Sequence, residues 1–317
     1  MRNDQWKLIT LIAASLVVSI PYVFYELNGS YDYALPRRGI KLLAMIITAV
    51  AIAYSTVIFQ TITHNRILTP SIMGLDSMYV LIQTIIVFFF GSTSFMIVQH
   101  EVNFFISVVA MLGFAVFLFN GLFKNGKRPI YFLLLVGIIL GTFLSSISTF
   151  LQVIIDPNEF FTVQDRMFAS FQNVNDDLVW IGLVIVVVVI IYNRKMMNVL
   201  DAISLGKEIS VNLGVSYNQV VRRMLISTAV LISVSTALVG PITFFGLIVA
   251  NLSYQFFRTY QHKVIVTGAI SISIILLVGG QFVVERIFTF STTLSVIINF
   301  VGGVYFIYLL LRESKTT

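Results

Sequence analysis

The chain has 317 residues, of which 58% are hydrophobic and 11% are charged, whereas a soluble domain carries about 25% charged residues. Because one membrane-spanning helix uses roughly 20 residues, this composition can fill about nine or ten spans. Little chain is left for a soluble catalytic domain or a nucleic-acid-binding surface. The absence of cysteine excludes disulfides, thiolate metal sites and cysteine nucleophiles.

Long apolar runs, separated by glycine, proline or charged residues, are the candidate spans. They lie at 7–25, 39–61, 72–91, 103–123, 130–155, 178–192, 221–239, 242–257, 263–282 and 294–311. The run at 242–257 is short and interrupted by glycine. Backbone polar groups in hydrocarbon must pair within their own segment, so we expect helices throughout. Residues 1–317 are predicted to form one transmembrane domain, that of an all-α polytopic membrane protein.

The basic residues predict the orientation, because lysine and arginine collect in short loops on the cytoplasmic side. An inward amino terminus places five basic residues outside: Arg37, Arg38, Lys41, Arg166 and Arg286. The inner set is Arg2, Lys7, Arg66, Lys124, Lys127, Arg128, Arg194, Lys195, Lys207, Arg222, Arg223, Arg258, Lys263, Arg312 and Lys315. This bias predicts a multi-pass plasma-membrane protein with both termini in the cytoplasm.

Two loops are longer than the few residues that a simple connection needs. The first, 156–177, mixes acidic residues with phenylalanines and is predicted to form an external amphipathic helix. The second, 193–222, is predicted to be cytoplasmic and to form two short helices, with Gly206 and Gly214 as breaks. It either couples the spans to a partner or lies as a linker against the lipid headgroups.

Ionisable side chains are nearly absent from the predicted spans, where each costs about 2.5–3.5 kcal/mol on insertion scales. Asp76 is the only acid within a span, about one turn from its inner end, where the positive helix terminus favours it. We interpret Asp76 as structural, with a proton relay as the alternative. An ion-coupled secondary transporter would require more acids at mid-membrane.

Small and hydroxylated residues share one face of the predicted span 130–155. Gly137 and Gly141 form a GxxxG pattern, and Ser145 and Thr149 continue its i, i+4 spacing. Such a face either lets another helix approach closely or lines a polar path. The two glycines alone favour close packing, whereas the hydroxyl groups favour a path.

Signatures of an enzyme are missing from the sequence. Neither Gly126-Lys127 nor Gly206-Lys207 has the flanking residues of an ATP-binding loop, so any ATP hydrolysis must come from another chain. The histidines, His64, His100 and His262, are scattered and are predicted to lie at headgroup level rather than to bind a metal. We predict no catalytic residue, metal site or cofactor for this chain.

Four stretches, in order along the chain, resemble the FecCD-type permeases of ABC importers for ferric siderophores, haem and cobalamin. They are Leu35-Pro-Arg37, the segment 59–74, the segment 205–215 followed by 240–251, and the segment 302–312. Each is a weak signal alone, but four in order over nearly the whole chain are specific. The chain is similar to permeases of petrobactin-like catecholate siderophore importers, in which two different permeases often pair.

The resemblance implies a FecCD/BtuC-like permease fold of about ten helices and an importer for a ferric siderophore, with haem or cobalamin as alternatives. The implied partners are a second permease subunit, identical or paralogous, two ATP-binding subunits that hold ATP and Mg, an extracytoplasmic substrate-binding protein and the lipid bilayer. No nucleic acid is implied. The ATP-binding subunit is expected to contact the 193–222 loop at Asp201, Leu205, Gly206, Glu208, Leu213 and Gly214.

Two further sites are predicted, the first from the resemblance and the second from the small and hydroxylated residues described above. Arg37, Arg38 and Arg286 are expected to dock the substrate-binding protein, and their alternative role is to bind lipid phosphate. The translocation path is expected along one face of the predicted spans 130–155 and 294–311, whose alternative role is ordinary packing. Its expected residues are Gly141, Ser145, Thr149, Asn299 and Gly303.

Overall fold

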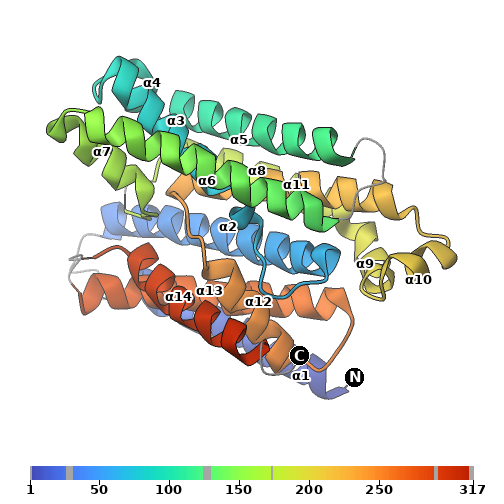
Figure 1. The fold of residues 1–317 in the computed structure, drawn as a ribbon. Coiled ribbons are helices and arrows are strands. Elements are labelled where there is room, and N and C mark those ends of the chain that lie inside the picture. Colours follow the sequence, from blue (N-terminus) through green and yellow to red (C-terminus); the bar gives the residue numbers. More distant parts are fainter. Residues whose placement is uncertain (1, 26–30, 124–129, 173, 289–291, 314–317) are drawn as a thin grey trace.

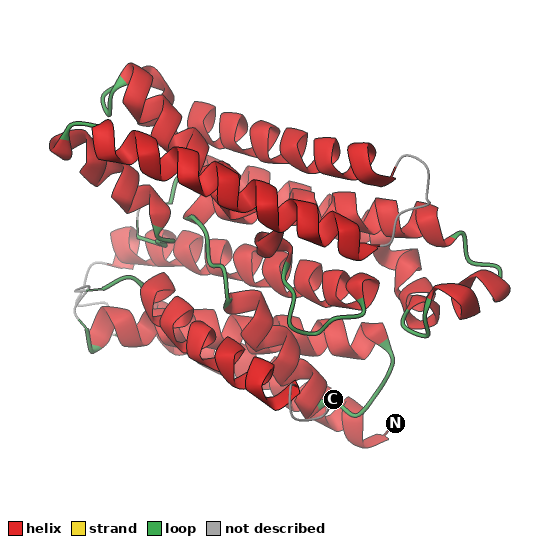
Figure 2. Ribbon diagram, viewed as in Figure 1, coloured by secondary structure: helices red, strands yellow, loops and turns green. Residues whose placement is uncertain are grey.

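The computed structural model describes residues 2–25, 31–123, 130–172, 174–288 and 292–313. In this part of the chain the regular elements are helices, as predicted (Figure 2). Some residues used in the charge pattern lie outside the described ranges: Lys124, Lys127, Arg128 and Lys315, together with Gly126 of the first Gly-Lys pair.

Each predicted span contains a helix. The helices at these spans are α1 (Arg2–Phe24), α2 (Tyr31–Thr63), α3 (Leu75–Phe90), α5 (His100–Phe123), α6 (Ile130–Ile154), α8 (Asp176–Asn193), α11 (Tyr217–Val239), α12 (Phe245–Phe256), α13 (His262–Arg286) and α14 (Leu294–Glu313). The short elements are η1 (Pro70–Met73), α4 (Phe95–Val98), α7 (Pro157–Met167), η2 (Arg194–Met196), α9 (Met197–Ile203) and α10 (Lys207–Asn212).

Eight of the described helices are long and apolar enough to cross a membrane, whereas α3 and α12 are shorter. At 1.5 Å per residue, the 12 residues of α12 extend about 18 Å, less than the ~30 Å of a hydrocarbon core. The predicted span 242–257 is therefore not helical throughout: the non-helical segment 240–244 leads into α12. Such backbone is tolerated at membrane depth where protein covers it, and Gly240 and Ile242 are buried.

The span predicted at 72–91 also differs from the structure, because its long helix starts only at Leu75. Pro70 opens η1, and Gly74 ends it with a φ of +88°, a conformation that residues with a Cβ rarely adopt. The chain therefore turns before α3 begins. This turn is buried at Met73, Gly74 and Leu75.

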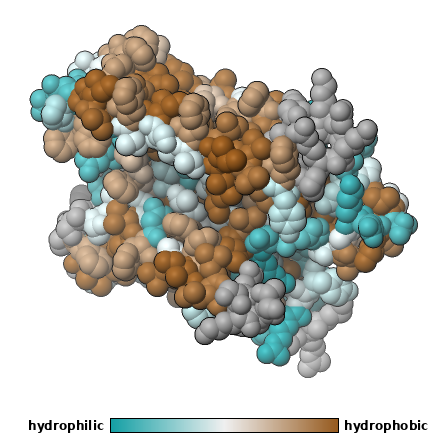
Figure 3. Space-filling view, in the orientation of Figure 1, coloured by the Kyte–Doolittle hydropathy of each residue, from teal (hydrophilic) through white to brown (hydrophobic). Residues whose placement is uncertain are grey.

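The helix α2 is the centre of the bundle. It packs against α1, α8, α11, α12 and α13, and the residues from Ala51 to Thr63 are all buried. The helix α11 is covered in the same way by α2, α5 and α8. In contrast, α6 and α14 present apolar side chains such as Val153 and Phe300 on the outside, as lipid-facing helices do. Figure 3 shows apolar surface on the near face of the molecule, with a paler, less apolar band across it.

The two ends of the bundle carry different short helices. In Figure 1, α9 and α10 lie at one end, and α4 and α7 lie at the other. The end with α9 and α10 also contains the last turn of α2 and the first turn of α13, because Thr61 and His262 are in contact with each other and His262 is in contact with Asp201 of α9. The loops of interest for function therefore gather at opposite ends.

Candidate functional site

The 193–222 loop forms the two short helices α9 and α10, joined at Gly206. Gly206 has a φ of +103° and Gly214, after α10, has a φ of +84°, so both positions favour glycine. The Ser210 hydroxyl donates to the Ala202 carbonyl at 3.0 Å and fastens α10 to α9. The pair of helices is thus a compact unit.

Four apolar side chains of this unit are exposed. They are Leu205, Ile209, Val211 and Leu213, with relative exposures of 50–62%. We call these four residues the apolar patch. Glu208 is also exposed beside it. Apolar side chains gathered on a loop outside the long helices are typical of a protein-binding surface.

The start of the 193–222 loop is anchored to α11. The Asn193 amide donates to the Ser227 hydroxyl at 2.8 Å, and the Arg223 guanidinium donates to the Asn193 side chain at 3.2 Å. The same guanidinium lies 3.6 Å from the centre of the Tyr192 ring and donates to the Tyr192 carbonyl. The loop therefore leaves α8 in a fixed direction.

Asp201, one of the residues expected to contact an ATP-binding subunit, also contacts the start of α13. Its Oδ1 lies 2.6 Å from Nδ1 of His262 and accepts the His262 backbone N–H at 2.8 Å. His262 is 4% exposed, so protein covers its ring at this end of the bundle. His262 also contacts Thr61, which is 201 residues away along the chain. No pattern in the neighbouring sequence predicts this contact or the one with Asp201.

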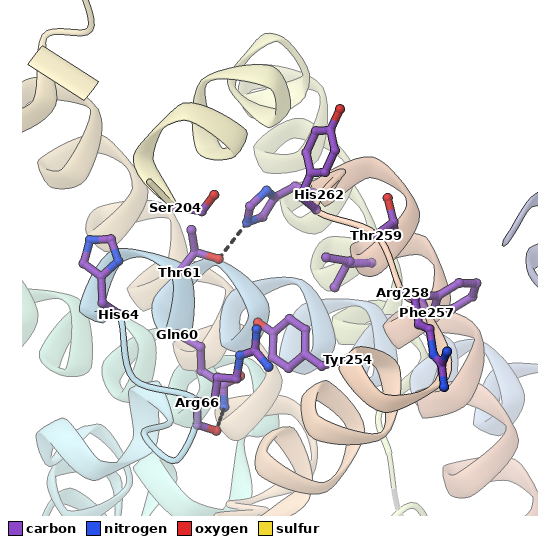
Figure 4. A pocket seen from close by; sticks show the side chains of 12 residues that line it. Gln60, Thr61, His64, Arg66, Ser204, Tyr254, Phe257, Arg258, Thr259 and His262 are labelled. Carbon is purple, nitrogen blue, oxygen red and sulfur yellow. Dashed lines mark hydrogen bonds between the residues drawn. The ribbon is translucent and has the colours of Figure 1, made fainter. Parts of the chain in front are cut away.

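An open cavity of about 580 Å³ lies beside His262, between the end of α2 and the connection from α12 to α13 (Figure 4). Arg66 lies over the Tyr254 ring at 4.8 Å in its wall. The Asn251 amide donates to the Arg66 carbonyl at 2.9 Å, which joins the stretch 59–74 to the stretch 240–251. Partial burial lowers the pKa of His64 in the same wall, because desolvation disfavours its charged form.

The three arginines expected to dock a binding protein make different contacts. Arg38 donates to the Tyr25 carbonyl at 2.6 Å, and Arg286 donates to the same carbonyl at 3.3 Å. Both therefore hold the end of α1, where cations also complement the helix dipole. Arg37 is exposed, and its guanidinium donates to the hydroxyl of the nearby Tyr33. Arg286 keeps an exposed surface as well.

The GxxxG pattern of α6 packs against the turn before α3. A Cβ added to Gly141 would lie 2.8 Å from Gly74 Cα, and one added to Gly137 would lie 3.2 Å from Met73 Cα. Both glycines are buried. Gly141 is therefore a packing position within this chain, because the Gly74 backbone occupies the space in front of it.

Beyond Gly141, the same α6 face becomes exposed. The Ser145 hydroxyl donates to Ser77 of α3 at 2.9 Å, and Thr149 donates to the Ser145 carbonyl at 2.9 Å. Ser148 differs, because it is buried against Thr84 of α3 at 2.9 Å. Ser145 and Thr149 are thus the exposed hydroxyl groups that continue the spacing of Gly137 and Gly141.

The helix α14 contributes a second set of small and polar groups. A Cβ added to Gly303 would meet no atom within 4 Å, whereas its neighbour Gly302 packs on Phe244. The Asn299 Oδ1 is buried without a hydrogen-bond partner among the described residues. Figure 1 shows α6 and α14 both on the near side, with η1 and α12 between them. Within this chain they pack on different neighbours: α6 on α3 and η1, α14 on α12 and α13.

Asp76 is held by hydroxyl groups near the start of α3. Thr243 donates to its Oδ2 at 3.2 Å and Thr236 to its Oδ1 at 3.5 Å. These contacts fasten η1 and α3 to α11 and to the segment 240–244. They agree with a structural role for this carboxylate.

Comparisons with known proteins give the family. The model of the FecCD transport family matches residues 5–312. The chain is 55% identical to the petrobactin import system permease protein YclO of Bacillus subtilis over 100% of both chains, and 25% identical to YclN, a petrobactin import system permease protein of the same organism, over 91% of this chain and 88% of that one.

A solved structure described as an inward-facing conformation of a metal-chelate type ABC transporter matches the fold. Its TM-score is 0.84 at 19% identity, and the match covers 98% of this chain and 99% of that chain. This similarity concerns the fold alone, whereas the family model spans nearly the full sequence. The chain is therefore a multi-pass membrane protein that belongs to the FecCD transport family of ABC permeases.

Proposed function

We propose that this chain is one permease subunit of an ABC importer that carries a ferric catecholate siderophore of the petrobactin type into the bacterial cytoplasm. The observation that carries the proposal is the 55% identity over the full length of a petrobactin import permease. Fold similarity alone could not support this proposal, because proteins of one fold have many different functions and substrates. The chain itself hydrolyses no ATP, and ATP and Mg bind the partner subunits.

The second permease subunit is a paralogue in this proposal. Two different permeases of one organism, both named for petrobactin import, match this chain at 55% and 25% identity. This difference supports a pair of unlike subunits. The exposed hydroxyls of α6 and the open space at Gly303 then face a path at the interface between the two subunits.

The ATP-binding subunit docks on the apolar patch, and both chain termini lie on the same cytoplasmic side. Leu213→Asp places a charge in the patch and is expected to weaken ATPase binding about tenfold or more, because a desolvated charge at an interface lacks a partner. Co-purification and a binding titration measure the loss. The control is Asn218→Asp, which adds the same charge at an exposed neighbouring position. Equal binding by both variants contradicts this docking site.

The substrate-binding protein docks at the opposite end of the bundle, on Arg37 and on the exposed part of Arg286. Charge reversal by Arg37→Glu is expected to slow association mainly at low salt, because rim charges act on the association rate. Arg38 serves to position α1 instead. Unchanged association at low salt contradicts the role of Arg37 and leaves lipid binding as its function.

Growth under iron starvation tests the proposed cargo directly. A strain that lacks only this chain, supplied with one iron source at a time, is expected to lose growth on ferric petrobactin and to keep growth on haem. A plasmid with the wild-type gene is expected to restore growth. Normal growth on ferric petrobactin, or a loss confined to haem or to cobalamin-dependent growth, contradicts the proposal.

A further inference from the structure

His262 joins three segments that are distant in the sequence. Its Nδ1 lies 2.6 Å from Asp201 Oδ1 on α9. Its Nε2 lies 2.8 Å from Thr61 Oγ1 on α2, a contact drawn in Figure 4. His262 itself is the first residue of α13, and its backbone N–H donates to the same Asp201 oxygen. Both ring nitrogens are therefore used, one by α9 and the other by α2.

The hydrogens available on Thr61 and His262 allow these contacts to persist whether the His262 ring is neutral or charged. The Thr61 hydroxyl has one proton and lies within hydrogen-bond distance of both His262 Nε2, at 2.8 Å, and the Val57 carbonyl, at 2.9 Å. If it donates to Nε2, the ring is neutral. If it donates to Val57, Nε2–H donates to Thr61, and the charged ring pairs with Asp201. The heavy atoms remain in place in both arrangements.

Burial makes the connection stiff. His262 is 4% exposed and Thr61 is 8% exposed, so water has little access to either contact. Hydrogen bonds of a charged group in such surroundings are shorter and stronger than those between neutral groups. Asp201 is 26% exposed on its other side, yet the oxygen that faces His262 accepts two donors.

The position of the connection suits a mechanical task. On one side is α9, fastened to α10 by the Ser210–Ala202 contact, and these helices carry the apolar patch. On the other side are α2, the central helix, and α13, which runs the length of the bundle to Arg286. A displacement of α9 as a rigid body would therefore move two spans directly.

We propose that Asp201, His262 and Thr61 form a latch that transmits motion of α9 to α2 and α13 during transport. Asp201 is then a positioning residue and not part of the ATPase-binding surface. The proposal rests on the function proposed above, in which an ATP-binding subunit docks on the apolar patch. Docking and transmission are separate properties, so they are measured separately.

Removal of the Thr61 hydroxyl is the first test, made in the complete complex in proteoliposomes with the binding protein and ferric petrobactin. Thr61→Val is expected to lower the amount of siderophore taken up per ATP hydrolysed by about threefold, as the loss of one buried hydrogen bond predicts. ATPase binding is expected to stay unchanged. The matched control is Thr63→Val on the same helix, since Thr63 is also buried and its hydroxyl contacts only carbonyl groups of α2. Equal uptake per ATP in both variants overturns the latch.

Asp201 permits a test with rescue by a conservative variant. Asp201→Ala removes the acceptor and is expected to lower uptake per ATP about tenfold, because two donors lose their partner. Asp201→Asn retains an oxygen that can accept both donors and is expected to restore most of the uptake per ATP. If Asp201→Ala still transports with normal stoichiometry, the latch is wrong. If Leu213→Asp leaves ATPase binding intact, the docking site is wrong instead, and the two failures are distinguishable.

A distance measurement tests the latch without using activity. The chain has no cysteine, so spin labels can be attached to cysteines introduced at Ser204 and Lys263, both exposed and close to the latch. In the wild-type background we expect the label distance to stay the same with and without ATP, because α9 and α13 move together. With Asp201→Ala the distance is expected to change with nucleotide. A nucleotide-dependent distance in the wild type overturns the latch, even if every variant folds poorly.

Discussion

Glycine has different tasks in α6 and in the 193–222 loop. In α6, Gly141 has ordinary helical backbone angles but no room for a side chain, because Gly74 lies against it. In the loop, Gly206 has open space around it but a φ of +103°. The first glycine is required by its neighbour and the second by its own backbone. Replacement of the first should therefore damage the bundle, and replacement of the second should damage only the loop.

The largest effect is expected for Gly141→Ala. Its methyl group would lie 2.8 Å from a backbone carbon, so α6 and the turn at Gly74 must separate. We expect a loss of about 2–3 kcal/mol in the free energy of unfolding, as for an overpacked core. Thermal unfolding of the purified protein measures it. Gly113→Ala in α5 is the control, since no atom lies within 4 Å of its added methyl group. Equal melting temperatures contradict the packing role.

A smaller, local effect is expected for Gly206→Ala. The φ and ψ of +103° and 163° are nearly restricted to glycine, and strain of this kind costs about 1–3 kcal/mol. The loop can relax without separating the spans, so the melting temperature should change less than for Gly141→Ala. ATPase binding should fall instead. Gly39→Ala, at a helical position with open space, is expected to change neither property. A larger loss of melting temperature than for Gly141→Ala would reverse the comparison.

Gly214 is a second loop glycine that is required by its backbone conformation and not by a close neighbour. Its φ of +84° is a conformation that asparagine tolerates better than alanine does. Gly214→Ala is expected to cost about 1 kcal/mol, and Gly214→Asn about half as much. ATPase binding, titrated for both variants, should follow the same order. Equal ATPase binding by Gly214→Ala and Gly214→Asn would contradict this prediction.

The smallest effect on stability is expected for Ser145→Leu. Ser145 is exposed and loses one hydrogen bond, to Ser77, worth about 1 kcal/mol at most. Transport should nevertheless fall several-fold, because the side chain would narrow the proposed path. Ser146→Leu is the matched control, since Ser146 is also exposed and bonds only to its own helix. If both variants transport equally, the exposed α6 face is a packing or lipid-facing surface and not the path.

The helical fold was predictable because it depends on local composition. Apolar runs must become helices in hydrocarbon, so each run contains one in the structure. The start of α3 and the shortness of α12 were harder to predict, since they depend on what covers Gly74 and the segment 240–244. Hydropathy alone does not show which parts of the protein pack over these positions.

The candidate site was predictable only in part. Gly206 and Gly214 were recognised from the chain itself, because a positive φ is a local requirement. The partners of Asp201 and Gly141 were not, because His262 and Gly74 lie far from them in the sequence and meet them only through the fold. Without that contact, an acid in a polar loop is interpreted as exposed, and a GxxxG face can be packing or path.

Uptake by the reconstituted complex tests the central claim most directly, that this chain is a passive conduit driven by a separate ATPase. Proteoliposomes with both permeases and the ATP-binding subunits receive ferric petrobactin through the binding protein, either with ATP or with only a proton or sodium gradient. We expect accumulation with ATP and none with either ion gradient. Accumulation with an ion gradient and no nucleotide would contradict the account.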